Sequence, residues 1–290
     1  MVWLTWRQHR AQILVTAGFL AVVGVVLLVH GLGSSGLTDQ ALGAHYERLY
    51  VYLSWLPVVP LAAGLFWGAP LLARELERGT HRLAWTQSVS RLRWLAVKLG
   101  VLGLAVTAAG LLLGVMVGAW LDTFDGAWYA DRFDDTALFG ATGVLGGVWW
   151  LFGFVLGTAA GGVLRRTLPA FAVTIAVFVL VMMGLFSARQ DYAEPARIVV
   201  EDAESLPQSF ITDQTFLSPS GVDTDTVPEC ADVPGDEYTR CVHDAGYRTV
   251  LFYQPADRYW RFQFTETGIL LLASVLLAGP VVYRVARRPV

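Results

Sequence analysis

Six long stretches without a charged side chain constrain this sequence more than any other feature. They comprise residues 11–33, 51–73, 99–121, 137–164, 167–187 and 267–283, nearly half of the chain. An α-helix needs about 20 apolar residues, at roughly 1.5 Å each, to cross a hydrocarbon core about 30 Å thick. Five stretches reach that length, and the sixth reaches it when residues 264–266 lie in the interface. The sequence therefore predicts six transmembrane helices.

Composition argues against the alternative of a large soluble helical protein. Charged residues make up 16% of the chain, whereas soluble domains carry about 25%, and the mean hydropathy is +0.51. Soluble helices carry charges at the 3.6-residue period, but Ile13–Val29 and Ala170–Phe186 are apolar on every side. The first apolar stretch is too long for a typical signal peptide, so we expect it to be retained.

The charges divide the connections into two sets when these are taken alternately along the chain. One set holds almost only cations, namely Arg7, Arg10, Arg74, Arg78, Arg82, Arg91, Arg93, Lys98, Arg165, Arg166, Arg284, Arg287 and Arg288. Its carboxylates are Glu75 and Glu77, so the other set has 22 of the 24 in the chain. Because Lys and Arg accumulate in cytoplasmic loops, both termini are predicted to be cytoplasmic.

The longest outer connection, residues 188–266, contains the two cysteines of the chain, Cys230 and Cys241. Disulfides persist outside the reducing cytosol, which favours a bridge over two free thiols. Alternating and β-branched residues predict strands at Arg197–Glu201 and Tyr247–Tyr253. We expect a small extracytoplasmic α/β or β-containing domain rather than a flexible acidic loop.

The predicted fold class is thus an all-α membrane protein with six transmembrane helices and one insertion between helices five and six. Residues 1–187 hold the first five helices, 188–266 the extracytoplasmic domain, and 267–290 the sixth helix and a cytoplasmic tail. Three prolines predict a bent or interrupted second helix: Pro57, Pro60 and Pro70. Three glycines at four-residue spacing suit close helix packing, within the chain or between subunits: Gly153, Gly157 and Gly161.

The sequence does not match the P-loop or zinc-peptidase motifs. A P-loop needs a lysine in Gly-Lys-Ser/Thr, and the single lysine, Lys98, lies between Val97 and Leu99. The histidines form no His-Glu-x-x-His pair of a zinc peptidase. An acidic group without nearby histidines is interpreted as a solvated outer loop: Asp122, Asp125, Asp131, Asp134 and Asp135. We expect no catalytic residue, no metal and no nucleic-acid partner.

The connection between the second and third spans carries the most specific motif. It reads Glu77-Arg78-Gly79-Thr80, followed by Ser90-Arg91 and Lys98-Leu99. This pattern, with six spans and an outer segment before the last, resembles the ABC-2 type permeases, the membrane halves of one class of ABC exporter. The segment 73–100 and the opening residues 3–10 resemble actinobacterial members in particular.

This resemblance implies that residues 74–98 form a coupling segment that docks on a separate cytosolic P-loop ATPase, which binds ATP and Mg. The residues at or near that contact would be Arg74, Glu75, Glu77, Gly79, Thr80, Ser90 and Arg91. Residues 1–10 would form an elbow helix at the inner membrane surface. Two permeases, as a homodimer or with a sister permease, would form the pathway, and the chain itself would hold no cofactor.

The predicted function is therefore the permease subunit of an ABC-2 exporter. Its bacterial plasma-membrane location is inferred from the absence of Asn and from Lys98 being the single lysine among 21 Lys and Arg residues, a bias typical of GC-rich bacterial genomes. The alternative is a membrane-anchored sensor or immunity protein whose segment 188–266 binds a ligand. That alternative requires no ATPase.

Overall fold

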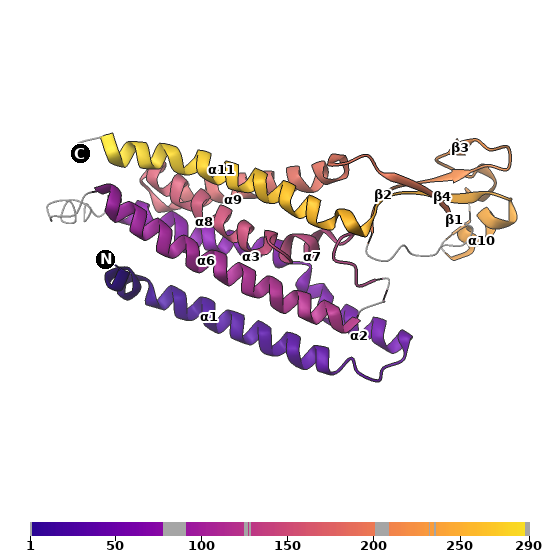
Figure 1. Cartoon of the computed structure of the whole chain (residues 1–290), viewed down its shortest axis with the longest axis horizontal. Helices are drawn as coiled ribbons and strands as arrows, with labels where there is room; N and C mark the ends of the chain where they lie inside the picture. The colour runs from indigo at the N-terminus through magenta and orange to yellow at the C-terminus, as the bar shows by residue number, and fades with distance from the viewer. Residues whose placement is uncertain are drawn as a thin grey trace.

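In the computed structural model, the chain forms a long helical bundle with a small antiparallel sheet at one end (Figure 1). The structure describes residues 2–77, 91–124, 127, 129–200, 209–231, 233–234 and 236–287. Within them, six helical segments are long and apolar enough to cross a membrane: Arg7–Leu32, Asp39–Arg74, Leu92–Phe124, Leu145–Leu164, Thr167–Asp191 and Ala256–Tyr283. Each predicted span has a counterpart among them.

Five spans are built on continuous α-helices. These are α1 Val2–Leu32, α6 Arg91–Leu121, α8 Leu145–Leu164, α9 Thr167–Ala188 and α11 Tyr259–Arg287. The most buried is α8, which packs against α6, α9, α11 and the second span. In contrast, α1 packs mainly on α6 and leaves most of its apolar surface exposed. The core of the bundle is therefore centred on α8.

The second span is interrupted, as its prolines predict. It consists of α2 Asp39–Leu53, the 3₁₀ turn η1 Leu56–Val58, α3 Val59–Ala62, the π-helical segment η2 Ala63–Gly68 and α4 Ala69–Glu77. Proline has no N–H to donate, so it is tolerated where a new helical segment begins. The helical segment also starts earlier than the predicted residue 51, at Asp39. It includes charged residues of α2, whose side chains remain exposed: Asp39, Glu47 and Arg48.

Three glycines of α8 bring it into backbone contact with this interrupted span. A Cβ atom at Gly153, Gly157 or Gly161 would lie under 3.0 Å from a carbonyl oxygen of the second span. Those oxygens belong to Pro60, Gly64 and Ala69. Small residues allow two helix backbones to approach closely in a membrane. Packing within the chain, rather than between subunits, is therefore confirmed as the role of these glycines.

The fourth span is shorter than predicted, because residues 137–164 form two helices. These are α7 Thr136–Ala141 and α8, and the chain turns between them at Gly143, whose φ of +60° favours glycine. The side chain of Gln263 in α11 fills the turn. Its Oε1 accepts from the N–H of Leu145 at 3.1 Å, and its Nε2 donates to the carbonyl of Phe139 at 2.9 Å. Because Gln263 is more than 100 residues away in the sequence, no local pattern predicts this helix break.

A buried ion pair lies where the fifth and sixth spans meet beneath the sheet. Arg189, in the turn η4 Arg189–Asp191, donates from Nε to Oε1 of Glu266 at 2.9 Å. Their side chains are 1% and 0% exposed, and the guanidinium lies 4.0 Å from the ring centre of Phe139. The sequence assigns both residues to the segment 188–266. In the structure, Glu266 lies inside the bundle, because α11 begins at Tyr259.

The insertion between α9 and α11 is a four-stranded antiparallel sheet with one short helix. The strands are β1 Ala196–Val200, β2 Phe210–Leu217, β3 Asp223–Thr224 and β4 Arg248–Gln254, in the order β1-β4-β2-β3. The two strands predicted from sequence correspond to β1 and β4. A disulfide between Cys230 and Cys241 joins the turn η5 Pro228–Cys230 to α10 Asp236–Asp244. Beneath it lies a small core that includes Phe216, Val227 and Val242.

Candidate functional site

The residues assigned to ATPase coupling belong to the end of the bundle that is remote from the sheet. The starts of α1 and α6 and the end of α11 lie together there (Figure 1). Arg74, Glu75 and Glu77 lie in the last turns of α4, and Arg91 begins α6. Gly79, Thr80 and Ser90 lie outside the described residues. The structure thus describes the two flanks of the coupling segment.

Glu77 reaches from α4 to the start of α9. Its Oε1 accepts from the backbone N–H of Thr167 at 2.8 Å, and its Oε2 accepts from the Thr167 hydroxyl at 3.2 Å. The first N–H groups of a helix have no partner within the helix and favour negative charge. Arg166, at the cap position of α9, offers no side-chain acceptor. The carboxylate of Glu77 therefore supplies this cap from a different span.

The turn that Glu77 caps is unusually tight. Arg165 and Arg166 alone connect α8 to α9, and Arg165 adopts a left-handed conformation with φ of 55°. A non-glycine residue seldom adopts this conformation without support from its surroundings. The contact from Glu77 therefore holds three spans together at this end: the second, the fourth and the fifth.

The other flank of the coupling segment is packed into the bundle. Trp94 and Leu95, in the first turns of α6, contact a cluster formed by Leu72, Ala159 and Val281. Lys98, assigned to the connection from sequence, lies within α6 and is 4% exposed, with its Nζ 4.5 Å from the ring centre of Trp94. A long lysine side chain can pack its methylene groups against apolar neighbours in this way. Motion of either flank would therefore move packed helices.

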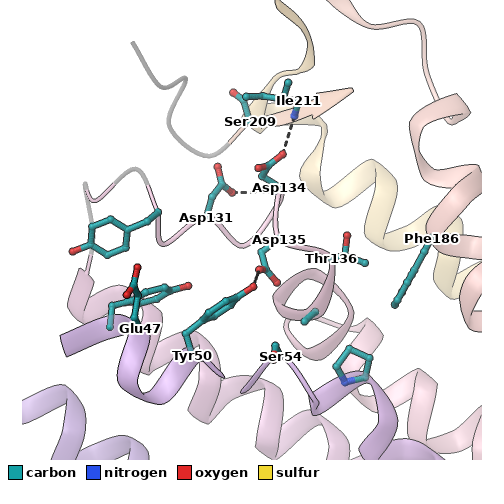
Figure 2. A pocket seen from close by; sticks show the side chains of 14 residues that line it. Glu47, Tyr50, Ser54, Asp131, Asp134, Asp135, Thr136, Phe186, Ser209 and Ile211 are labelled. Carbon is teal, nitrogen blue, oxygen red and sulfur yellow. Dashed lines mark hydrogen bonds between the residues drawn. The ribbon is translucent and has the colours of Figure 1, made fainter. Parts of the chain in front are cut away.

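At the opposite end, a partly open cavity of about 970 Å³ lies between the helices and the sheet (Figure 2). Its walls come from α2, the connection that precedes α7, α7 itself, the end of α9 and the start of β2. The polar and charged lining residues are Tyr46, Glu47, Tyr50, Ser54, Tyr129, Asp131, Asp134, Asp135, Thr136 and Ser209. We call this the outer cavity.

Three aspartates of the outer cavity are held by hydrogen bonds from the backbone. Asp131 accepts from the N–H of Phe133 at 2.6 Å, and Asp134 accepts from the N–H of Ile211 in β2 at 3.0 Å. Asp135 caps α7 through the N–H of Leu138 at 2.7 Å and also accepts from the Tyr50 hydroxyl (Figure 2). The interpretation of the acidic group as a solvated outer loop is wrong for Asp131, which is 8% exposed, whereas Asp134 stays exposed and Asp135 is partly buried.

The surroundings of two of these aspartates change their acidity. Burial raises the pKa of Asp131 above its usual range, against the opposing effect of the N–H groups that it accepts from. Burial likewise raises the pKa of Asp134, and the neighbouring charge of Asp135 adds to the increase. A carboxylate with a raised pKa gains more than a solvated one from a nearby positive charge. In their charged form, the carboxylates that line the cavity attract cations.

Aromatic rings form the wall beside these carboxylates. Tyr46 stacks on Tyr50 with ring centres 5.3 Å apart, and the tilted ring of Tyr129 has its centre 5.0 Å from that of Tyr46. Tyr46 is 3% exposed, and its hydroxyl has no hydrogen-bond partner among the described residues. A buried hydroxyl without a partner is uncommon, because its desolvation is uncompensated.

Residues 7–189 match the protein family described as ABC-2 membrane transporter related. This chain belongs to that family. The match covers the first five spans and ends before the sheet begins. No curated protein and no solved structure matches the chain. With its six apolar helices, the protein is a multi-pass transporter permease, for which the family implies association with a membrane and with an ATP-binding subunit.

In this ABC-2 related permease, sequence analysis missed the outer cavity. Its residues come from segments far apart in the chain, and each segment by itself has an ordinary interpretation. Tyr46, Glu47 and Tyr50 look like the polar end of a helix, and the aspartates look like a loop. The one available signal was three tyrosines, at 46, 50 and 52, around a glutamate at the outer end of a span. Such aromatic residues are common at membrane interfaces.

Proposed function

We propose that this protein is the permease subunit of an ABC-2 exporter, driven by a separate cytosolic ATPase that binds ATP and Mg. Family membership supports the permease role. In the proposed orientation, the end of the bundle with both termini faces the cytoplasm of a bacterium, and the sheet lies outside. The segregation of Lys and Arg supports this orientation.

The observation that carries this proposal is the link from the coupling segment to the transport helices. Glu77 joins the end of the second span to the start of α9, and Trp94 anchors the start of α6 in the bundle. In our proposal, ATP binding draws two ATPase subunits together, and the coupling segment passes this motion to both flanks. The interrupted second span then changes its bend, because its helical hydrogen bonds are already broken.

Pairing of two permeases, as a homodimer or with a sister permease, completes the pathway in this proposal. The chain contributes no step of ATP chemistry. Its part is to bind the cargo, to respond to the ATPase and to alternate the access of the pathway.

Affinity purification from native membranes in mild detergent, followed by mass spectrometry, tests the proposal. We expect a P-loop ATPase in stoichiometric amount with the wild-type protein. We expect its loss with the double variant Glu77→Lys/Gly79→Pro, while membrane insertion is retained. Glu237→Lys is the matched control, because it reverses a charge on α10 in the sheet region. A preparation without ATPase, repeated after crosslinking, would reject the exporter.

One further variant separates capping from docking. Glu77→Gln retains a carbonyl that can accept from Thr167, but it removes the negative charge. If Glu77 acts by capping α9, this variant keeps the ATPase bound. If the carboxylate itself contacts the ATPase, this variant loses it.

A further inference from the structure

The outer cavity concentrates negative charge without a cation to balance it. Glu47, Asp131, Asp134 and Asp135 line it, and no Lys, Arg or His is among the described residues that line it. Among the described residues, the exposed ion pairs between Arg and Asp lie elsewhere, at Arg132–Asp122 and Arg197–Asp223. The donors seen on the three aspartates are backbone N–H groups and one tyrosine hydroxyl, which are all neutral. Neutral donors position these carboxylates but do not neutralise their negative charge.

The buried hydroxyl of Tyr46 is a second, independent sign of a ligand. Tyr46 lines the cavity, is 3% exposed, and its Oη lacks a partner in the described part of the chain. Its ring stacks on the rings of Tyr50 and Trp120, and the ring centres are 5.3 Å apart in each pair. This stacking holds the ring in place beside the cavity, with its hydroxyl buried and unpaired among the described residues.

The cavity also has an apolar wall. Pro57, Ala137, Phe186 and Ile211 line it together with the polar residues. Figure 2 shows Glu47 and Phe186 on opposite sides, with Asp135 and Thr136 between them. A ligand that fills this space meets negative charge and tyrosine rings on one side and hydrocarbon on the other.

The geometry favours an organic cation over a metal ion. No group of three or more His, Cys, Asp or Glu side chains in the described residues is arranged to hold a metal. The volume of about 970 Å³ is that of a site for a drug-sized molecule. Tyrosine faces attract ammonium groups, and they do so more strongly where water is excluded.

We propose that the outer cavity binds amphiphilic amines, that is, organic ammonium ions with an apolar body. Resting on the permease role proposed above, such amines are the class of molecule that this transporter carries, and the cavity is where they are held at the outer side of the membrane. The ammonium group faces the carboxylates of Glu47 and Asp134 and the rings of Tyr50 and Tyr129. The apolar body lies toward Phe186 and Pro57. The Tyr46 hydroxyl bonds a polar atom of the ligand.

Direct binding to the purified full-length protein tests this proposal. The probe is a dansyl-labelled pentylamine, and its fluorescence is followed with the protein in nanodiscs of neutral lipid. The comparison compound is the same dansyl molecule with a hydroxyl in place of the amine. We expect the amine to bind about tenfold more tightly, since two charge contacts of ordinary strength together give a factor of this order. Equal binding of the two compounds would overturn the proposal.

Conservative variants locate the site. Glu47→Gln/Asp134→Asn removes two charges but keeps oxygens that accept hydrogen bonds, so the sheet contact at Ile211 is retained. We expect it to weaken amine binding about tenfold and to leave binding of the alcohol unchanged. Asp213→Asn is the matched control, because it removes an exposed charge from β2 outside the cavity lining. Unchanged amine binding in the double variant, with a normal melting temperature, would refute the site.

Tyr46→Phe is the finest test, because it deletes one oxygen that makes no described contact. We expect a loss of amine affinity of a few fold with no loss of thermal stability. If Tyr46→Phe binds the amine as tightly as the wild type, the Tyr46 hydroxyl does not contact the ligand. The proposed site would then be no different from an acidic surface, and the proposal would be overturned.

The binding experiment and the ATPase purification test the proposed site and the proposed exporter function separately. Amine binding in a protein that never associates with an ATPase would support the site and reject the exporter. An associated ATPase without selective amine binding would support the exporter and reject the proposed cargo class.

Discussion

The two ends of the helical bundle, named inner (at the coupling segment) and outer (at the sheet) after the proposed orientation, both carry many charged side chains, but these side chains have different partners. At the inner end, the carboxylate of Glu77 is engaged by a helix N-terminus. At the outer end, the aspartates around the cavity accept only from neutral donors and remain uncompensated by cations among the described residues. The inner charges therefore stabilise a junction between helices, whereas the outer charges are available to a ligand.

A rigid α8 connects the two ends, and its disruption is expected to have the largest effect. In Gly157→Val, the new side chain would collide with the backbone of Gly64. Overpacking of a well-packed core costs about 1–3 kcal/mol and sometimes more, and a fixed backbone cannot yield as a side chain can. We expect loss of folded protein in size-exclusion chromatography. Gly184→Val is the control, since no atom lies within 4 Å of a Cβ there. Equal amounts of folded protein for the two variants would contradict the close packing of α8 on the second span.

Among the described residues, the outer end also contains a buried ion pair, Arg189–Glu266, whose two charges compensate each other, in contrast to the cavity. Removing one partner in Arg189→Met leaves Glu266 buried without its cation, and such losses cost about 3–5 kcal/mol. We expect a large fall in the melting temperature of the detergent-solubilised protein. Arg132→Met is the control, because its pair with Asp122 is exposed and contributes about 1 kcal/mol or less. Similar melting temperatures for both variants would contradict burial of the Arg189 pair.

At the inner end, removal of the Glu77 cap is expected to have a moderate and local effect. Glu77→Ala should cost about 1 kcal/mol, by analogy with the loss of an N-cap. Hydrogen exchange at the first turn of α9 should accelerate while exchange in the sheet stays constant. Arg74→Ala is the control on the same helix. Unaltered exchange at Thr167 would show that the cap is dispensable.

The smallest expected effect is a pH dependence confined to the outer cavity. The pKa of Asp134 is raised in the folded protein, so the folded state binds its proton more tightly than the unfolded state does. The groups that face it are the N–H of Ile211 and the charge of Asp135. Protonation then adds stability that is complete below the unfolded value of 3.8 and is lost as pH rises through the raised value.

Hydrogen exchange near the start of β2, measured from pH 4 to pH 7, detects this change. We expect protection to decrease slightly as pH rises, and we expect Asp134→Asn to flatten the dependence. The buried Asp131 should contribute in the same direction, because its pKa is raised by the same cause. A slope of opposite sign would show that the N–H groups outweigh burial.

Local patterns predicted much of the fold. Uncharged stretches identified the spans, the prolines predicted the break in the second, and β-branched residues identified β1 and β4. These features follow from short segments, whose hydropathy and backbone preferences act locally. Local patterns did not reveal the helix break at Gly143, where Gln263 fills the turn, or the buried pairing of Glu266 with Arg189.

The candidate sites were predicted unevenly for the same reason. The motif around Glu77 identified a segment between two spans, but its partner Thr167 lies two spans further along the chain. The outer cavity was missed altogether, because Tyr46, Asp134 and Ile211 come from three separate parts of the chain. Their chemistry depends on proximity, which no local pattern records.

The sequence by itself determined that this chain enters a membrane, how many times it crosses and how charge divides between its two sides. Hydropathy and charge act residue by residue on partitioning between water and lipid, so they can be counted along the chain. The tertiary structure alone decided which charges are compensated. It buried Arg189 against Glu266, set Glu77 on the start of α9, and left the carboxylates of the outer cavity facing an open space. Compensation is a matter of distance in space, and only the folded chain sets those distances.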